Sequence, residues 1–259
     1  MKNQNPIGLF DSGIGGTSIW KEVNALMPFE NTIYIADSKN APYGLKSKDE
    51  IIALSCKNTE FLLENNCKII VVACNTATTN AIKELRAKYD VPFIGIEPAI
   101  KPAALQSKTQ KIGILATKGT LNSELFHKSV ANHPDVTIIE QIGHGLVQLI
   151  ENGDMNSAEM EELLKSYLNP MVEKNIDYLV LGCSHYPYLI PQIKKIIPPQ
   201  IKIIDSGEAV AKQTQKILEQ SHLLNLTNEK SSQIFYTNSE PDVLETILNH
   251  KEKVIYKNF

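Results

Sequence analysis

Short runs of apolar residues alternate along this chain with longer stretches in which apolar residues recur at helical spacing. The apolar runs cover residues 7–10, 32–36, 69–73, 92–96, 112–116, 136–139, 178–182, 201–204 and 233–236. Several are continuous and rich in β-branched residues, which is typical of parallel strands buried on both faces. Because strands and helices alternate from the start, we predict an α/β fold with doubly wound parallel sheets.

Local signals mark the ends of several predicted helices. Residues 47–50 (Ser-Lys-Asp-Glu) have the spacing of a capping box, and residues 156–159 (Asn-Ser-Ala-Glu) indicate a second helix start. The helix that begins there is expected to reach about Lys174. A helix carrying Trp20 and Val23 is expected to end before Pro28.

The series of elements divides near Glu97-Pro98, which is the expected crossing between two domains. A second alternating series starts at Lys111, and the residues after about 211 are too few for a core of their own. We therefore predict a first domain of residues 1–97 plus 211–259 and a second domain of residues 98–210. The tripeptide Asp-Ser-Gly at residues 11–13 and 205–207 is weak evidence for duplication.

Two of the predicted strands each deliver a cysteine to their carboxyl end. Residues 69–73 lead to Cys74, and residues 178–182 lead to Cys183. Ligands of open α/β sheets bind at that edge. Two thiols that flank one small molecule can remove a proton from one face of a carbon and return a proton to the other face. This pattern suggests a racemase or epimerase.

The four cysteines differ in their surroundings. Cys56 and Cys67 have no polar turn beside them and are interpreted as inert packing residues. Cys74 and Cys183 are followed by small polar residues that suit a turn into a helix. A helix N-terminus lowers the pKa of a thiol, so we expect the pKa of both to be lowered towards neutrality.

Other polar residues lie near the predicted strand ends. The loop of residues 11–16 (Asp-Ser-Gly-Ile-Gly-Gly) lacks the third glycine of a dinucleotide fingerprint, because Ser18 stands there. Its glycines either bring backbone N–H groups close to a carboxylate ligand or form an ordinary tight turn. Residues 42–44 (Pro-Tyr-Gly) are equally ambiguous. His185, two residues after Cys183, is able to favour a thiolate or carry its proton.

Composition excludes several classes of function. The 259 residues carry a net charge of −3 and no basic stripe, so nucleic acid is not an expected partner. We expect a cytoplasmic protein without a membrane partner, since no signal-like or membrane-spanning apolar stretch occurs. The four cysteines are expected to be free thiols in that compartment. No C-x-x-C is present, so no metal site is expected.

Five segments taken in order resemble the bacterial glutamate racemases. They are residues 10–16 (Phe-Asp-Ser-Gly-Ile-Gly-Gly), 41–44 (Ala-Pro-Tyr-Gly), 72–77 (Val-Ala-Cys-Asn-Thr-Ala), 95–99 (Gly-Ile-Glu-Pro-Ala) and 181–185 (Leu-Gly-Cys-Ser-His). The resemblance implies two doubly wound parallel-sheet domains related by pseudo-symmetry, with the active site in the cleft between them. It also implies a homodimer that needs no cofactor and that converts L-glutamate into the D-glutamate of peptidoglycan, which maintains cell wall and cell shape.

The resemblance further implies roles for individual residues. Cys74 would act as the base on D-glutamate and Cys183 as the base on L-glutamate. Asp11 and His185 would assist the two thiols, and Asp37 and Glu151 would be further assisting carboxylates. Substrate would be held by Asp11, Ser12, Pro42, Tyr43, Gly44, Asn75, Thr76, Ser184 and His185.

The sequence departs from the family pattern at two places, and several alternative functions remain. Ser184 replaces the usual threonine, and residues 143–145 (Gly-His-Gly) lack the usual cysteine and proline ahead of Leu146. One alternative is a racemase for aspartate or another small acid. Others are an isomerase or decarboxylase with a single essential cysteine, and an amino-acid sensor without catalysis.

Overall fold

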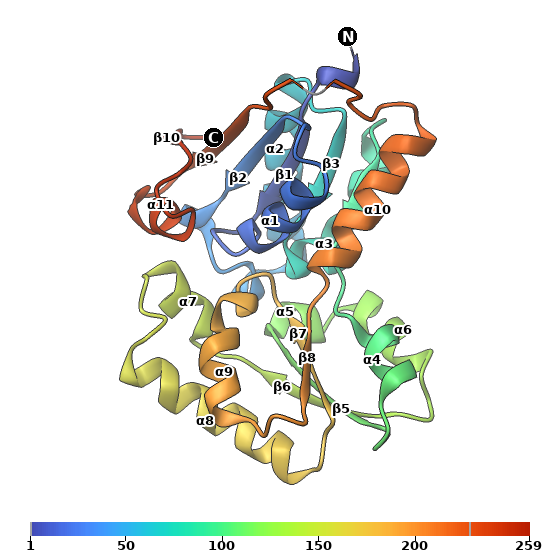
Figure 1. Ribbon diagram of the computed structural model, residues 1–259, viewed down its shortest axis with the longest axis vertical. Coiled ribbons are helices and arrows are strands. Elements are labelled where there is room, and N and C mark those ends of the chain that lie inside the picture. The colour runs from blue at the N-terminus through green and yellow to red at the C-terminus, as the bar shows by residue number, and fades with distance from the viewer. Residues whose placement is uncertain (1, 228) are drawn as a thin grey trace.

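The computed structural model describes residues 2–227 and 229–259 as two parallel sheets covered by helices (Figure 1). The first sheet has six strands in the order β10-β9-β2-β1-β3-β4. Its strands are β1 (Ile7–Asp11), β2 (Thr32–Ala36), β3 (Ile69–Val72), β4 (Phe93–Gly95), β9 (Gln233–Thr237) and β10 (Val254–Tyr256). All of their pairings are parallel, as predicted.

Helices cover both faces of the first sheet because its strands are apolar on both sides. Leu9 packs into the core cluster that contains Trp20, whereas its neighbour Phe10 packs into the cluster that contains Leu62. One face is covered by α1 (Thr17–Leu26) and α10 (Gly207–Gln220), the other by α2 (Lys48–Glu64) and α3 (Asn75–Lys88), and α11 (Asp242–Ile247) lies near β9. The predicted capping box at Ser47 and Glu50 is confirmed at the start of α2.

The second sheet has four parallel strands in the order β6-β5-β7-β8. They are β5 (Lys111–Ala116), β6 (Thr137–Ile142), β7 (Tyr178–Gly182) and β8 (Lys202–Ile204). The accompanying helices are α4 (Ile100–Gln106), α5 (Lys118–Leu121), α6 (Glu124–Ala131), α7 (Leu146–Glu151), α8 (Ala158–Glu173) and α9 (Ile190–Ile196). Short 3₁₀ turns η1 (Lys2–Gln4), η2 (Ser38–Asn40), η3 (Tyr43–Leu45) and η4 (Tyr186–Leu189) complete the described elements.

The two sheets repeat one strand order. The segment β2-β1-β3-β4 of the first sheet corresponds to β6-β5-β7-β8 of the second. Cys74 after β3 therefore corresponds to Cys183 after β7, and the predicted pair of doubly wound domains is confirmed. The two Asp-Ser-Gly tripeptides are not equivalent, because the first begins at the last residue of β1 and the second follows β8, the counterpart of β4.

The two chain crossings between the sheets contact each other. Ser206, after β8, donates its hydroxyl to the backbone carbonyl of Glu97, after β4. Helix α10 then packs along α1, and β9 pairs with β2 at the side of the first sheet (Figure 1). The C-terminal residues thus return to the first sheet as expected, while the residue limits of the two domains stay a prediction.

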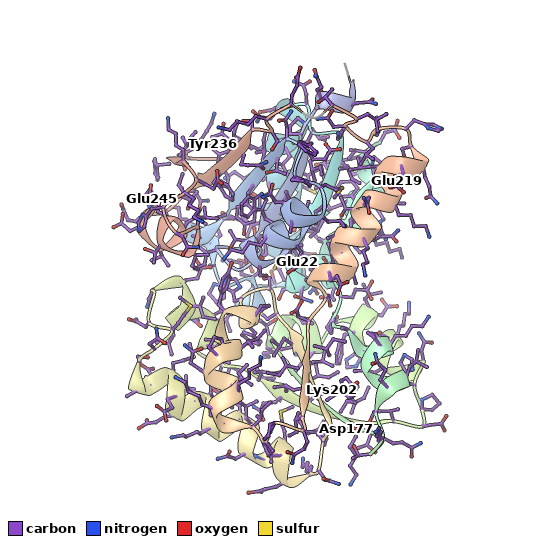
Figure 2. The ribbon with its side chains drawn as sticks, viewed as in Figure 1. Glu22, Asp177, Lys202, Glu219, Tyr236 and Glu245 are labelled. Carbon is purple, nitrogen blue, oxygen red and sulfur yellow. The ribbon has the colours of Figure 1, made fainter. Side chains whose placement is uncertain are left out.

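The carboxyl ends of both sheets face each other. Asp177 precedes β7 and Lys202 begins β8, so both residues mark the amino ends of these strands. Figure 2 labels both far from the first sheet. Strand order reverses between β1 and β3 in one sheet and between β5 and β7 in the other, and ligands bind at such switch points. Within the described parts of the chain, no helix is both long and apolar enough to cross a membrane.

Candidate active site

A small cavity lies where the two switch points meet. Both Cys74 and Cys183 line it. Most of the predicted binding residues line it with them: Ser12, Pro42, Tyr43, Gly44, Asn75, Thr76, Ser184 and His185. Each sheet contributes one thiol, so two sulfur atoms reach the same cavity from two different domains.

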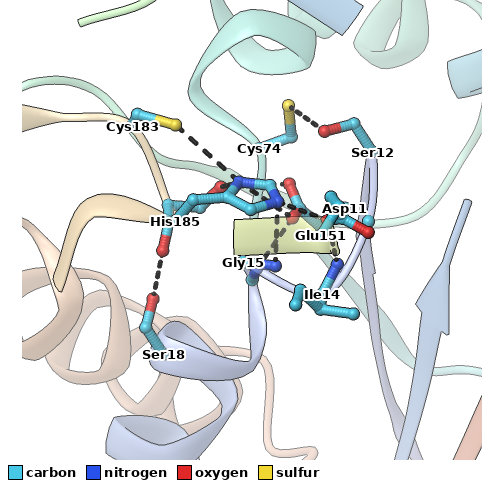
Figure 3. Close-up of polar contacts among 12 residues, drawn as sticks. Asp11, Ser12, Ile14, Gly15, Ser18, Cys74, Glu151, Cys183 and His185 are labelled. Atoms are coloured by element: carbon cyan, nitrogen blue, oxygen red, sulfur yellow. Dashed lines mark hydrogen bonds and ion pairs between the residues drawn. The ribbon is translucent and has the colours of Figure 1, made fainter. Parts of the chain in front are cut away.

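Cys74 caps helix α3, as its position after a strand suggested. The backbone N–H of Ala77 donates to Cys74 Sγ at 3.4 Å, and Ser12 Oγ lies 3.7 Å from the same sulfur (Figure 3). The expectation of a lowered pKa is nevertheless wrong for Cys74. Burial, together with the charge of Asp11, raises its pKa well above the usual value and outweighs the N–H donor.

Cys183 does not begin an α-helix, which corrects a second expectation. The residues after β7 form a turn, and the short 3₁₀ helix η4 is capped by His185 rather than by the cysteine. Instead of a helix N-terminus, the Cys183 thiol faces an imidazole, with His185 Nδ1 3.8 Å from its Sγ (Figure 3). The two thiols therefore have different polar partners.

His185 is buried among acidic groups. Its Nε2 lies 2.5 Å from Glu151 Oε1, and its Nδ1 lies 3.9 Å from Asp11 Oδ2. Burial lowers the pKa of His185, but the contacts with Cys183 and Glu151 and the charge of Asp11 raise it to well above the usual value. The raised pKa favours the protonated imidazole, whose Nε2–H donates to Glu151 Oε1. Gly15 N–H also lies 3.3 Å from Nε2 and can donate to that nitrogen only when the ring is neutral.

The glycine-rich loop after β1 does bind a carboxylate, but this carboxylate belongs to the protein. Ile14 N–H donates to Glu151 Oε1 at 2.7 Å, and Ser38 Oγ donates to Glu151 Oε2 at 2.9 Å. A Cβ atom on Gly13 would lie 1.9 Å from Glu151 Oε1, and one on Gly15 would lie 2.2 Å from the His185 ring. The glycines thus allow the loop to approach the second domain closely.

Glu151 comes from α7, whose start also depends on a glycine. Gly145 adopts φ +80° immediately before Leu146, a conformation that favours glycine. The carboxylate of Glu151 then reaches across to the first domain and to His185. The structure therefore brings Glu151 to the site, although the sequence segment before it departs from the family pattern.

Asp11 and Asp37 lie behind the cavity wall. Asp11 accepts from Gly16 N–H at 2.8 Å and from the Ser184 hydroxyl at 3.2 Å, and burial raises its pKa. Asp37 accepts the Tyr43 hydroxyl. The three predicted carboxylates thus contact residues that line the cavity rather than lining it themselves.

Asn75 is oriented as a ligand-binding residue. It is 2 % exposed, and neither atom of its side-chain amide has a hydrogen-bond partner within the described part of the chain. A buried amide without a partner costs free energy, so a polar ligand in the cavity would supply the missing hydrogen bonds. Thr76, beside it, pairs its hydroxyl with that of Thr117 at 2.8 Å.

Sequence reasoning missed two residues that line the cavity, Thr117 and Val147. Thr117 follows β5 and caps α5, so the signal that identified Cys74, a polar residue between strand and helix, was available for it. Val147 lies in the apolar part of α7, where nothing in the sequence distinguishes it from a core residue.

Comparison with known proteins identifies the class of this fold and site. The model of the Asp/Glu/Hydantoin racemase family matches residues 15–214. A glutamate racemase of Herpetosiphon aurantiacus is 43 % identical over 242 residues, which are 93 % of this chain and 95 % of that protein. The chain belongs to the Asp/Glu/Hydantoin racemase family, and the predicted resemblance and isomerase class are confirmed.

Solved structures of glutamate racemases share the whole fold. The enzyme of Francisella tularensis in complex with D-glutamate has a TM-score of 0.86 at 30 % identity, covering 99 % of this chain and 98 % of that one. The Escherichia coli enzyme in complex with L-glutamate and the activator UDP-MurNAc-ala has a TM-score of 0.87 at 31 % identity, covering 98 % of each chain.

Proposed function

We propose that this protein is a glutamate racemase that interconverts L- and D-glutamate by proton transfer between the α-carbon and two cysteines. The observation that carries the proposal is the pair of buried thiols, one from each domain, in a single cavity. Relatives named glutamate racemase, and related structures in complex with D-glutamate and with L-glutamate, support glutamate as the substrate.

The reaction requires one thiolate and one thiol at a time. In the direction from L- to D-glutamate, the Cys183 thiolate removes the α-proton and the Cys74 thiol donates a proton to the opposite face of the carbon. Cys183 ends as thiol and Cys74 as thiolate, which is the form that acts on D-glutamate. The raised pKa of Cys74 suits it to the role of proton donor in the first direction.

The main barrier is the weak acidity of the α-hydrogen. The amide of Asn75, which has no partner among the described residues, can stabilise charge that develops on the substrate carboxylate. The cavity is small and both of its thiols are buried, which limits access of water and strengthens this interaction. Catalysis therefore depends on residues of both domains.

His185 in the cavity wall and three carboxylates behind it assist the thiols. Protonated His185 stabilises negative charge on Cys183, and Glu151 holds the imidazole in position. Asp11 lies near both His185 and Cys74, and Asp37 holds Tyr43. We further propose that this chain is cytoplasmic, forms a homodimer and supplies D-glutamate for peptidoglycan, as the family resemblance implies.

An optical assay tests the function directly. Purified protein is incubated with L-glutamate without added cofactor, and circular dichroism follows the optical activity of the amino acid. The proposal predicts decay to zero with glutamate and much slower decay with L-aspartate as the matched control. Faster decay with aspartate would favour the alternative substrate, and no decay with either would favour a sensor.

The acid limb of the pH profile is expected to move when Asp11 is replaced. The charge of Asp11 raises the pKa of Cys74, so Asp11→Asn removes a negative charge beside the thiol and lowers that pKa. We expect the acid limb of kcat/KM to shift to lower pH by about one unit. Profiles of both enantiomers should shift together, since L- and D-glutamate have equal free energies. A shift to higher pH would contradict this role of Asp11.

A further inference from the structure

The C-terminal segment reaches the site through one asparagine. Asn238 immediately follows β9, on which Tyr236 is labelled in Figure 2, and it is 4 % exposed. Its Nδ2 donates to Asp37 Oδ1 at 2.5 Å, and its Oδ1 accepts the backbone N–H of Lys39 at 2.9 Å. Both contacts lie on the segment that follows β2, about 200 residues earlier in the chain.

Asp37 connects Asn238 to a residue that lines the cavity. Its Oδ1 accepts Asn238 Nδ2 and Asn40 Nδ2, and its Oδ2 accepts the hydroxyl of Tyr43. Tyr43 is 1 % exposed and lines the cavity that holds both thiols. Its hydroxyl also accepts from Asn58 Nδ2 of α2 at 3.1 Å. Three amides, from η2, from α2 and from the residue after β9, thus hold the Asp37–Tyr43 pair.

We propose that Asn238 is a positioning residue that acts through Asp37 to hold Tyr43 in its substrate-binding orientation. The inference rests on the proposed function and extends it to a part of the chain that does not line the cavity. The two amide donors on Oδ1 fix the rotation of the Asp37 carboxylate, which in turn aims Oδ2 at the Tyr43 hydroxyl. The C-terminal segment therefore completes the binding site as well as the sheet.

Steady-state kinetics of Asn238→Ala test this role. Loss of the amide is expected to raise KM for both enantiomers of glutamate about tenfold while kcat changes less than about twofold, because Tyr43 binds substrate and transition state alike. The matched control is Asn225→Ala. Asn225 also anchors the C-terminal segment to the first domain, because its Nδ2 donates to Phe29 O at 2.8 Å. This contact lies near the amino end of β2, away from the cavity, so the KM of Asn225→Ala should not change.

A double-mutant cycle separates positioning from a general loss of stability. Tyr43→Phe removes the hydroxyl that Asp37 accepts, so adding Asn238→Ala to Tyr43→Phe should raise KM less than about twofold further. An equal increase of KM in both backgrounds, or an unchanged KM in Asn238→Ala, would overturn the proposal. If Asn238→Ala does not fold, Asn40→Ala tests the same carboxylate, because the half-buried Asn40 also donates to Asp37 Oδ1. We expect a smaller increase of KM for Asn40→Ala, and an unchanged KM would contradict the proposal.

The same assay separates failure of this inference from failure of the proposed function. Wild-type protein that does not racemise glutamate would contradict the function itself. Wild-type protein that is active, with Asn238→Ala behaving like Asn225→Ala, would contradict only the role of Asn238.

Discussion

Replacing either Cys74 or Cys183 by serine is expected to lower kcat/KM for both enantiomers by about 10³-fold or more. Each thiol acts as base in one direction and as acid in the other, so one missing thiol blocks the whole cycle. Serine keeps the size of the side chain, while its hydroxyl is too weak an acid to form the required anion. The measurement is the rate of racemisation of each enantiomer by each variant.

The control for these variants is a cysteine outside the site. Cys56 lies in α2 and is half-buried, so Cys56→Ser should change kcat/KM by less than about twofold. Should one of the two site variants keep nearly full activity while the other is inactive, the alternative with a single essential cysteine would replace the two-base mechanism.

His185→Asn is expected to lower kcat/KM about 10²-fold and to move the acid limb of the pH profile to higher pH. The raised pKa of His185 favours a positive charge facing Cys183, and removal of that charge disfavours the thiolate. The direction is opposite to that expected for Asp11→Asn, because the two side chains carry opposite charges. Kinetic pH profiles of the two variants, measured side by side, give the comparison.

A histidine outside the site serves as the control. His127 is exposed on α6, and His127→Asn should leave both the rate and the pH profile unchanged. A His185→Asn profile that keeps its acid limb, or moves it to lower pH, would contradict a protonated imidazole beside Cys183.

Most of the fold followed from local sequence patterns. The strand β3 was predictable because Ile69–Val72 is an unbroken β-branched run, and α2 because Ser47 and Glu50 form a capping box. The start of α8 was predictable from the small polar residues at 156–157, and Ser157 caps the helix by accepting the N–H of Met160. The pairing of β9 with β2 joins segments 201 residues apart by backbone hydrogen bonds, which leave no signature in the side chains.

The candidate site was predictable where its residues end strands. Cys74 and Cys183 follow buried runs, and equivalent strand positions brought both to one cavity. The electrostatics were not predictable, because the pKa of Cys74 depends on burial and on Asp11, which is distant in sequence. The partner of the glycine loop was also not predictable, because Glu151, whose Oε1 accepts from Ile14 N–H, lies 137 residues away in the sequence.

The most direct test of the two-cysteine mechanism is the order in which deuterium enters glutamate in deuterated water. Wild-type protein is given L-glutamate, and both enantiomers are separated and analysed by mass spectrometry at early times. Proton removal by Cys183 and deuteron donation by Cys74 predict α-deuterated D-glutamate while the remaining L-glutamate is still unlabelled. Equal early labelling of both enantiomers, or D-glutamate that retains the original proton, would contradict the account.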